Sequence, residues 1–141
     1  MLFRSGNVVT DGTDGVVERQ GYYFKMILPD DTPARPIGFV AEAATGGNPA
    51  GLPGASNAEI MWCCYAWPVQ RTKTGNRAFF INQAGDVIAT LNNVAATSYN
   101  GTQTIPTNDA AFSVASDMGA ELGLAIAGLN AQAGVWTPVG N

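Results

Sequence analysis

The chain has 141 residues, a net charge of −4 and no His, and only 13% of its residues are charged against 46% hydrophobic. This length suits one domain, residues 1–141, with a sizeable core, and the composition excludes intrinsic disorder, which needs low hydrophobicity and high charge. The charge balance argues against binding to nucleic acid or an anionic membrane surface. The lack of His removes the commonest general base and metal ligand.

The N-terminal third predicts short strands separated by turns. Residues 16–19 suggest an edge strand after a polar, Gly-rich loop. Residues 21–28, GYYFKMIL, predict a strand, because aromatic and branched residues lie between Gly21 and Pro29. Residues 38–44 suggest a short strand or one helical turn, and residues 45–58 suggest a connecting loop without charge.

The stretch from residue 59 to residue 90 predicts the centre of a sheet. Residues 60–67 are apolar throughout, as in a strand that is buried on both faces. Residues 77–82 and 86–90 form a hairpin pattern, in which Gly85 is free to take a positive φ.

The C-terminal third predicts helix. In residues 109–129, apolar side chains at Phe112, Met118, Leu122 and Ile126 give one helical stripe, although Gly119 and Gly123 interrupt it. The sequence therefore predicts an α+β fold, an antiparallel sheet of four to five strands with short C-terminal helices packed on one face. The predicted core is Tyr23, Met26, Trp62, Tyr65, Phe79, Ile81, Val87 and Trp136.

Candidate chemical groups each have a simpler structural interpretation. Residues 11–15, DGTDG, resemble part of a calcium loop but lack its remaining ligands, so a turn is expected. The carboxylates of Glu59, Asp86 and the pair Asp30–Asp31 suit turns and strand ends better than acid–base catalysis. Asn100–Gly101–Thr102 matches a glycosylation sequon and equally suits a turn. We expect no catalytic, cofactor-binding or metal-binding residue, and no cofactor.

Two further groups are expected to belong to the core. Cys63 and Cys64 are adjacent, so in a strand they point to opposite faces, and we expect two reduced, buried, unreactive thiols. Trp62, Tyr65 and Trp67 could form a shelf for a ligand, but core packing is expected of an apolar strand.

The order GYYFKMILPDD, EIMWCCYAWPV, GNRAFFINQAGDVIAT and a Trp136–Thr137–Pro138 tail resembles the globular heads of bacterial type IV pilin-like proteins and type II secretion pseudopilins. It also resembles an uncharacterised extracytoplasmic bacterial family in which a GYYF strand precedes a WP strand and an FxxNQxG hairpin. The similarity covers roughly residues 16–141, and the hairpin from Phe79 to Asp86 is its most specific part.

The resemblance implies a non-enzymatic structural subunit of an envelope or secretion assembly. Its partners would be protein subunits of the same or a related assembly, with no nucleic acid. It would be extracytoplasmic and membrane-anchored through an N-terminal helix. In pilin-like proteins that helix packs on one face of the sheet.

Residues 2–5, LFRS, match the translation of a sequencing adapter in one frame, so we expect residues 1–5 to be foreign and the helix to be missing. Loss of the helix would leave an apolar sheet face exposed. The alternative is an extracytoplasmic binding module of unknown ligand that uses its long loops.

Overall fold

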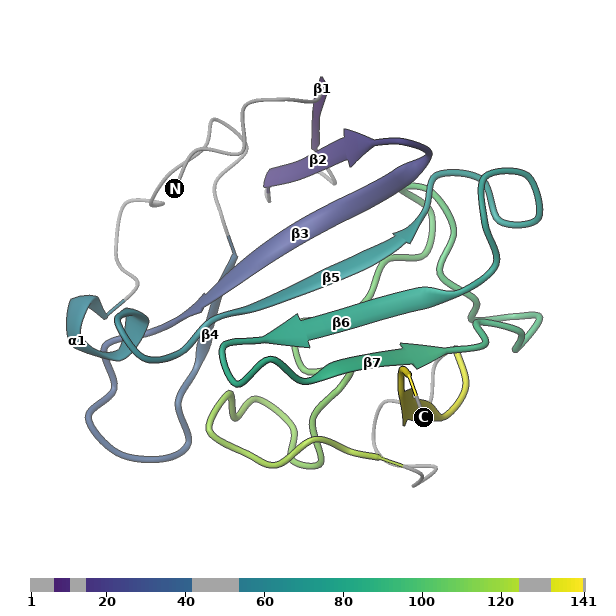
Figure 1. The fold of residues 1–141 in the computed structure, drawn as a ribbon. Helices are drawn as coiled ribbons and strands as arrows, with labels where there is room; N and C mark the ends of the chain where they lie inside the picture. The colour runs from purple at the N-terminus through teal and green to yellow at the C-terminus, as the bar shows by residue number, and fades with distance from the viewer. Residues whose placement is uncertain (1–6, 11–14, 42–53, 125–132, 141) are drawn as a thin grey trace.

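The computed structural model describes residues 7–10, 15–41, 54–124 and 133–140 of the chain (Figure 1). Nearly all of its regular structure is strand. The elements in chain order are β1 (Asn7–Thr10), β2 (Gly15–Arg19), β3 (Tyr22–Pro29), β4 (Phe39–Ala41), α1 (Ala55–Ala58), β5 (Cys63–Pro68), β6 (Ala78–Asn82), β7 (Val87–Thr90) and β8 (Trp136–Pro138).

The strands form one sheet in the order β1-β2-β3-β5-β6-β7-β8, and every neighbouring pair is antiparallel. β4 also pairs with β3, through Phe39–Ala41 opposite the last residues of β3. Strand β5 pairs with one edge of β3, so β2 and β4 both pair with the other edge. The strands predicted from sequence over 16–19, 21–28, 60–67, 77–82 and 86–90 all occur, with shifted ends, and the strand alternative for residues 38–44 is confirmed at β4.

Local turn chemistry explains the two central hairpins. Gln20 and Gly21 both have positive φ between β2 and β3. Between β6 and β7, Gly85 has a φ of +82°, and the Asn82 side-chain oxygen accepts hydrogen bonds from the N–H groups of Ala84 and Asp86. An Asn that binds its own turn in this way fixes the register of the hairpin.

The predicted α+β class is wrong, because the only helix among the described residues is the four-residue α1. Residues 109–124 form turns and isolated bridges, including one between Phe112 and Leu122. The Ser113 N–H donates to Glu121 O and the Gly123 N–H donates to Ala111 O, so this segment folds back on itself. The rest of the predicted helical stretch, residues 125–129, lies outside the described residues.

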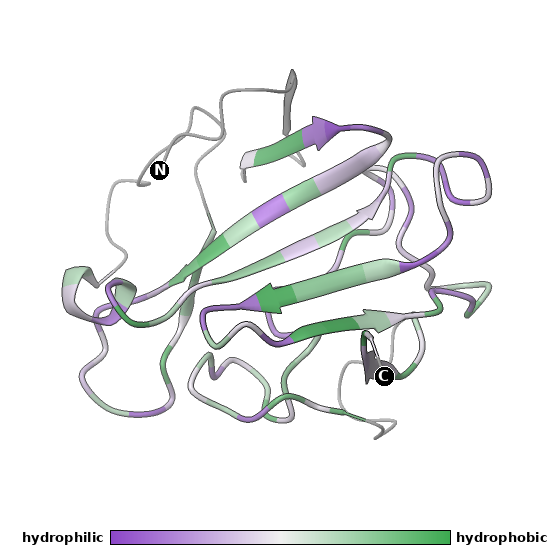
Figure 2. Cartoon of the chain, in the orientation of Figure 1, coloured by the Kyte–Doolittle hydropathy of each residue, from purple (hydrophilic) through white to green (hydrophobic). Residues whose placement is uncertain are grey.

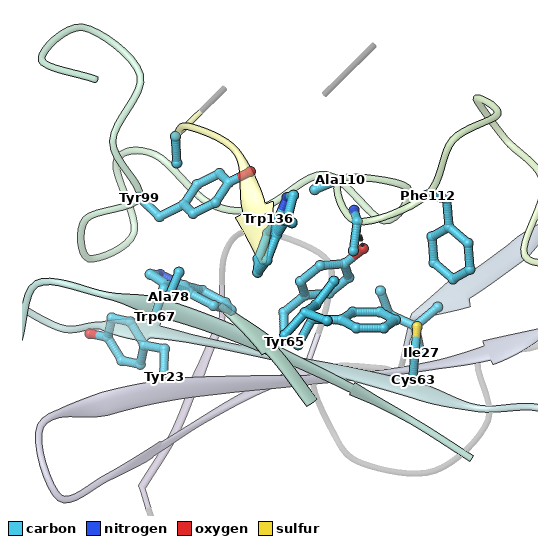
Figure 3. Close-up of a cluster of buried hydrophobic side chains, with 14 of the residues drawn as sticks. Tyr23, Ile27, Cys63, Tyr65, Trp67, Ala78, Tyr99, Ala110, Phe112 and Trp136 are labelled. Atoms are coloured by element: carbon cyan, nitrogen blue, oxygen red, sulfur yellow. Dashed lines mark hydrogen bonds between the residues drawn. The ribbon is translucent and has the colours of Figure 1, made fainter. Parts of the chain in front are cut away.

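The core lies on one face of the sheet, between the strands and the segments that follow β7. Figure 3 shows Tyr99, Ala110, Phe112 and Trp136 on the same side of the sheet. They cover the buried face, whose side chains include Tyr23, Ile27, Cys63, Tyr65, Trp67, Ala78, Phe80 and Ile88. Aromatic rings form much of this contact, with ring centroids 5.5 Å apart for Phe80 and Phe112 and 6.2 Å apart for Tyr65 and Trp136.

The predicted core is only partly correct. Tyr23, Tyr65 and Trp136 are buried as expected. Met26, Trp62 and Phe79 are half-buried, and Ile81 and Val87 are exposed. Of these five, Met26, Phe79, Ile81 and Val87 belong to the opposite face of the sheet, which the core-forming segments do not cover.

Candidate functional site: an open apolar face

Both faces of the sheet are apolar, which is unusual for a sheet that is covered on one side. Along β3, buried residues alternate with half-buried ones, as in a one-sided antiparallel strand. The half-buried positions are nevertheless Tyr22, Phe24, Met26 and Leu28. The outward face of such a sheet is normally polar. Packing among the described residues therefore does not explain why these outward side chains are apolar.

Strand register joins the outward side chains into one surface. Phe24 lies opposite Ala66, and Met26 lies opposite Cys64. We call this surface the open face, and it consists of Tyr22, Phe24, Met26, Cys64, Ala66, Phe79, Ile81 and Val87. Figure 2 shows the mainly hydrophobic colouring of β6 and β7, which carry three of these residues.

The open face contains a shallow depression of about 340 Å³. Every residue that lines it belongs to β3, β5, β6 or β7. Ile81 and Val87, which are opposite each other in the register, remain 37% and 39% exposed. The Tyr22 and Phe79 rings lie 6.1 Å apart at the other side of the depression. None of the residues that line the depression is charged.

The two cysteines lie on different faces, as their adjacency predicts. Neither forms a disulfide and both are buried, as the sequence predicts, and their expected lack of reactivity stays a prediction. Cys63 lies in the core, where burial foremost and the neighbouring Cys64 raise the pKa of its thiol far above the ordinary value. Cys64 lines the depression and is 8% exposed, so its sulfur is adjacent to the open face.

The three aromatics considered as a ligand shelf do not form one. Tyr65 and Trp67 are fully buried on the core face, while Trp62 precedes β5 and is half-buried. The Trp67 indole N–H donates to Gly101 O at 2.8 Å, and the Tyr65 hydroxyl donates to Asn108 O at 2.9 Å. These bonds anchor the covering segments to the sheet, so core packing is the correct interpretation for both residues.

The carboxylates considered for catalysis lie at turns, near one end of the sheet. The Asp30 side chain accepts a hydrogen bond from the Thr32 N–H, and Asp86 accepts one from the Asn82 amide. Glu59 is exposed and follows α1. Asp31 is also exposed, in the turn after β3.

The other two motifs are a turn and a segment that is not described. Asn100 lies in a turn, where its side-chain oxygen accepts a hydrogen bond from the Arg71 N–H. Residues 11–14 of the calcium-loop candidate lie outside the described residues.

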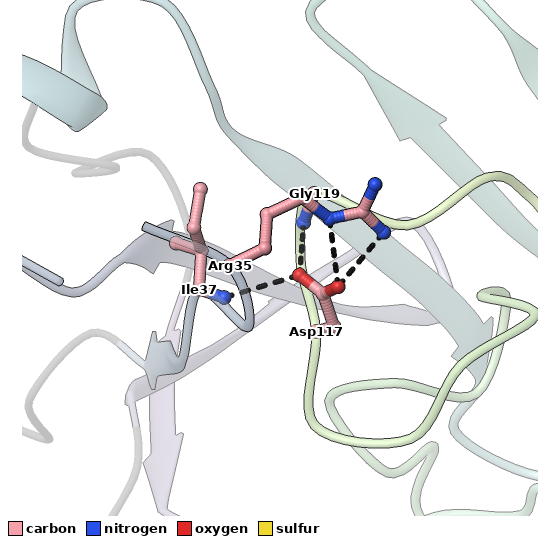
Figure 4. A network of polar contacts seen from close by, with 4 residues as sticks. All are labelled: Arg35, Ile37, Asp117 and Gly119. Carbon is pink, nitrogen blue, oxygen red and sulfur yellow. Dashed lines mark hydrogen bonds and ion pairs between the residues drawn. The ribbon is translucent and has the colours of Figure 1, made fainter. Parts of the chain in front are cut away.

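Asp117, which the sequence did not single out, forms a network of polar contacts with Arg35, Ile37 and Gly119 (Figure 4). It accepts hydrogen bonds from the N–H groups of Ile37 and Gly119, and an ion pair of 2.8 Å joins it to Arg35. Burial acts to raise the pKa of Asp117, but the hydrogen bonds from Ile37, Arg35 and Gly119 outweigh it and leave the pKa below its usual value. Because all its oxygens are engaged, Asp117 joins two covering loops and is not a free acid.

A second depression, a groove of about 830 Å³, lies beside the β6–β7 hairpin. The hairpin residues 82–86, residues 118–122 and the end of β8 line it. It carries two carboxylates, Asp86 and Glu121, beside the apolar Met61, Phe112 and Leu122. Its lining therefore combines acidic and apolar side chains.

Neither depression contains a metal site, since no cluster of three or more His, Cys, Asp and Glu side chains occurs in the part of the chain that is described. Among the same residues no helix has the length and apolar character required to cross a bilayer. Comparison of the chain with known protein families, with curated proteins and with solved structures finds no match.

Proposed function

We propose that the chain is a non-enzymatic structural subunit that is built into a larger protein assembly through its open face. The observation that carries the proposal is the outward apolar surface on four adjacent strands, from Tyr22 to Val87. Apolar patches of this kind on small proteins mark contact sites, because leaving them in water is costly. The side chains around both depressions also lack His and a paired nucleophile and base.

The size of the open face indicates the kind of partner. Four strands at a spacing of about 4.8 Å, with four to five residues each, give roughly 300 Å². Two copies joined face to face would then bury roughly 600 Å² in total, below the roughly 1,200 Å² of a stable interface. A single helix, about 10 Å wide, matches the depression between the outward side chains.

We further propose that the subunit is the head of a pilin-like or pseudopilin-like protein, extracytoplasmic and anchored by an N-terminal helix. Such a helix would cover the open face in the same way as it packs on the sheet of those heads. Recovery of the sequence that precedes residue 6 tests this finer proposal. An apolar helix that begins with Phe and carries a Glu near its start would support it, and a cleavable signal peptide directly before Gly6 would overturn it.

The assembly proposal is tested by changing the two most exposed residues of the open face together. In the double variant Ile81→Lys/Val87→Glu, the new charges lie opposite each other and can pair, so the sheet is retained. At high salt we expect the parent chain to bind a hydrophobic dye and to self-associate weakly in sedimentation, and the double variant to lose both properties. The matched control is Ile60→Glu, which changes a residue that is 67% exposed and outside the open face.

Cys64 supplies a second measurement of the same surface. Its thiol borders the depression, so any partner that covers the open face should slow its labelling. Cys63, fully buried on the other face, should stay unlabelled in every state and serves as the internal control. A parent chain that is monomeric at all salt concentrations and binds no dye would contradict the assembly proposal.

The alternative function is an extracytoplasmic binding module, and the groove beside the β6–β7 hairpin favours it. Its carboxylates, Asp86 and Glu121, suit a small cationic ligand with an apolar part. The binding-module alternative would be favoured over the assembly proposal if the parent chain bound no dye and if Glu121→Gln weakened binding of a cationic amphiphile.

A further inference from the structure

Basic residues gather at one end of the sheet. The β2–β3 turn and the loop between β5 and β6 lie at the same end, because Tyr22 is opposite Pro68 in the register (Figure 1, upper right). Four of the seven Lys and Arg residues of the sequence lie in these two segments. We call these four residues the basic end: Arg19, Arg71, Lys73 and Arg77.

Backbone and side-chain contacts fix the shape of the basic end. The Val69 N–H donates to Gly21 O at 2.9 Å, which ties the β5–β6 loop to the β2–β3 turn. Within the loop, the Thr72 N–H donates to Gly75 O and the Thr74 N–H to Gln70 O, both at 2.9 Å. The loop is therefore already ordered before any partner binds, which lowers the entropy cost of association.

Acidic residues gather at the opposite end. The turn after β3, the residue after α1 and the β6–β7 hairpin meet there, because Ile27 is opposite Cys63 and Cys63 is opposite Asn82. The Asn57 amide donates to Asp30 O at 2.9 Å and so holds α1 against the turn (Figure 1, left). We call the acidic residues of this end the acidic end: Asp30, Asp31, Glu59 and Asp86.

The two ends are too far apart to neutralise each other within one molecule. β3, which connects them, has eight residues and is therefore about 26 Å long. That distance exceeds the Debye length of about 10 Å at 0.1 M salt. Each end consequently presents its own sign to the solvent, although the whole chain has a net charge of −4.

We propose that the basic end of one copy of the chain docks against the acidic end of a second copy. The basic end has four positive charges beside the single carboxylate of Glu18, and the acidic end has four negative charges beside the Arg35–Asp117 ion pair. Complementary patches of this kind steer association and fix its orientation. The contact joins two different surfaces, so it is heterologous and continues from copy to copy as an open row.

A second copy explains the charges better than a nucleic acid does. A polyanion would contact the basic end but would be repelled by the negative remainder of the chain, whose isoelectric point is about 4.5. The acidic end would then have no counterpart. Self-docking satisfies both ends with one contact and requires no second component.

This inference goes beyond the proposed function, because it concerns the ends of the sheet and not its open face. Its test uses the full chain carrying Ile81→Lys/Val87→Glu, so that association through the open face is removed. At about 10 mM salt we expect sedimentation of multimers, and at about 500 mM salt a monomer, because screening weakens contacts between exposed charges. Association through the open face would respond to salt in the opposite direction.

Charge reversal identifies the contact. We expect Lys73→Glu/Arg77→Glu at the basic end, and separately Asp31→Lys/Glu59→Lys at the acidic end, each to weaken self-association about tenfold or more at low salt. An equimolar mixture of the two variants should form dimers again, because one variant keeps its acidic end and the other keeps its basic end. Circular dichroism verifies that each variant is folded.

Three results would overturn the proposal. They are an Ile81→Lys/Val87→Glu chain that is monomeric at low salt, charge-reversed variants that associate as strongly as that chain, and a mixture of the two that stays monomeric. Salt-sensitive binding of a short DNA duplex without self-association would assign the basic end to another partner. None of these results bears on dye binding by the open face, so the two proposals fail separately.

Discussion

At the scale of single residues, two buried tyrosines have opposite polar surroundings. The Tyr65 hydroxyl donates to Asn108 O and accepts from the Ala111 N–H at 3.1 Å. The Tyr99 hydroxyl is also buried, but has no hydrogen-bond partner among the described residues. Because a buried polar group without a partner opposes folding, these two hydroxyls have opposite effects on stability.

The matched substitutions Tyr65→Phe and Tyr99→Phe test this difference. Tyr65→Phe should lower the free energy of unfolding by about 1–3 kcal/mol, because it leaves the buried Ala111 N–H without an acceptor. Tyr99→Phe should change it by less than about 0.5 kcal/mol or raise it. Urea denaturation measures both, and equal losses for the two variants would show that the Tyr99 hydroxyl is also satisfied.

Asp117 predicts how stability depends on pH. Its pKa is lowered in the folded chain, so its stabilising effect is complete above its unfolded pKa of about 4 and is lost as the pH falls through the folded value. Asp117→Asn should lower the free energy of unfolding by about 1–3 kcal/mol at pH 7. The gap between parent and variant should narrow below about pH 4, and a gap independent of pH would refute this role.

At the scale of elements, the sequence predicts strands better than it predicts which face of the sheet is covered. Gly21 and Pro29 delimit β3, and Gly85 marks the β6–β7 turn, so local chemistry reveals both. The sequence places Ile81 and Val87 in the core, because apolar residues occupy both faces of these strands and do not show which face is covered. The choice of covered face depends on residues 91–124, which are distant in sequence and have no pattern that shows where they pack.

The predicted C-terminal helix fails for a related reason. The apolar residues Phe112, Met118 and Leu122 do pack in or against the core, as the predicted stripe requires. They do so from a loop that folds back on itself and not from a helix. Asp117 could not be recognised from the sequence either, because its partners Arg35 and Ile37 are about 80 positions away. Its network stabilises the loop in place of helical hydrogen bonds.

Gly123→Ala distinguishes the loop from a helix. In a helix this change would raise stability by about 1 kcal/mol. In the observed loop a Cβ at Gly123 would lie 3.1 Å from the carbonyl oxygen of Phe112, so the change should lower the midpoint of urea denaturation. A raised midpoint would favour the helix that the sequence predicts.

At the scale of the whole molecule, the two faces and the two ends of the sheet all differ in character. One face holds the core, the other is open and apolar, and the two ends of the strands carry opposite charge. If successive copies keep the same orientation about the row, end-to-end docking places their open faces along one apolar strip. A row of subunits could therefore hold partners that a single open face of roughly 300 Å² binds only weakly.

Trp136 lies in β8, which follows all the other described strands in the sequence, so its part of the core can form only late in synthesis. Its ring packs against Tyr65 and Tyr99, and β8 pairs with β7, so the core is incomplete until this late strand is in place. A ribosome therefore releases most of the sheet, with its two apolar faces, before the residues that close one of them have left the exit tunnel. The chain therefore exposes more apolar surface during synthesis than after it has folded. A chaperone would find its largest binding surface on the chain in that interval.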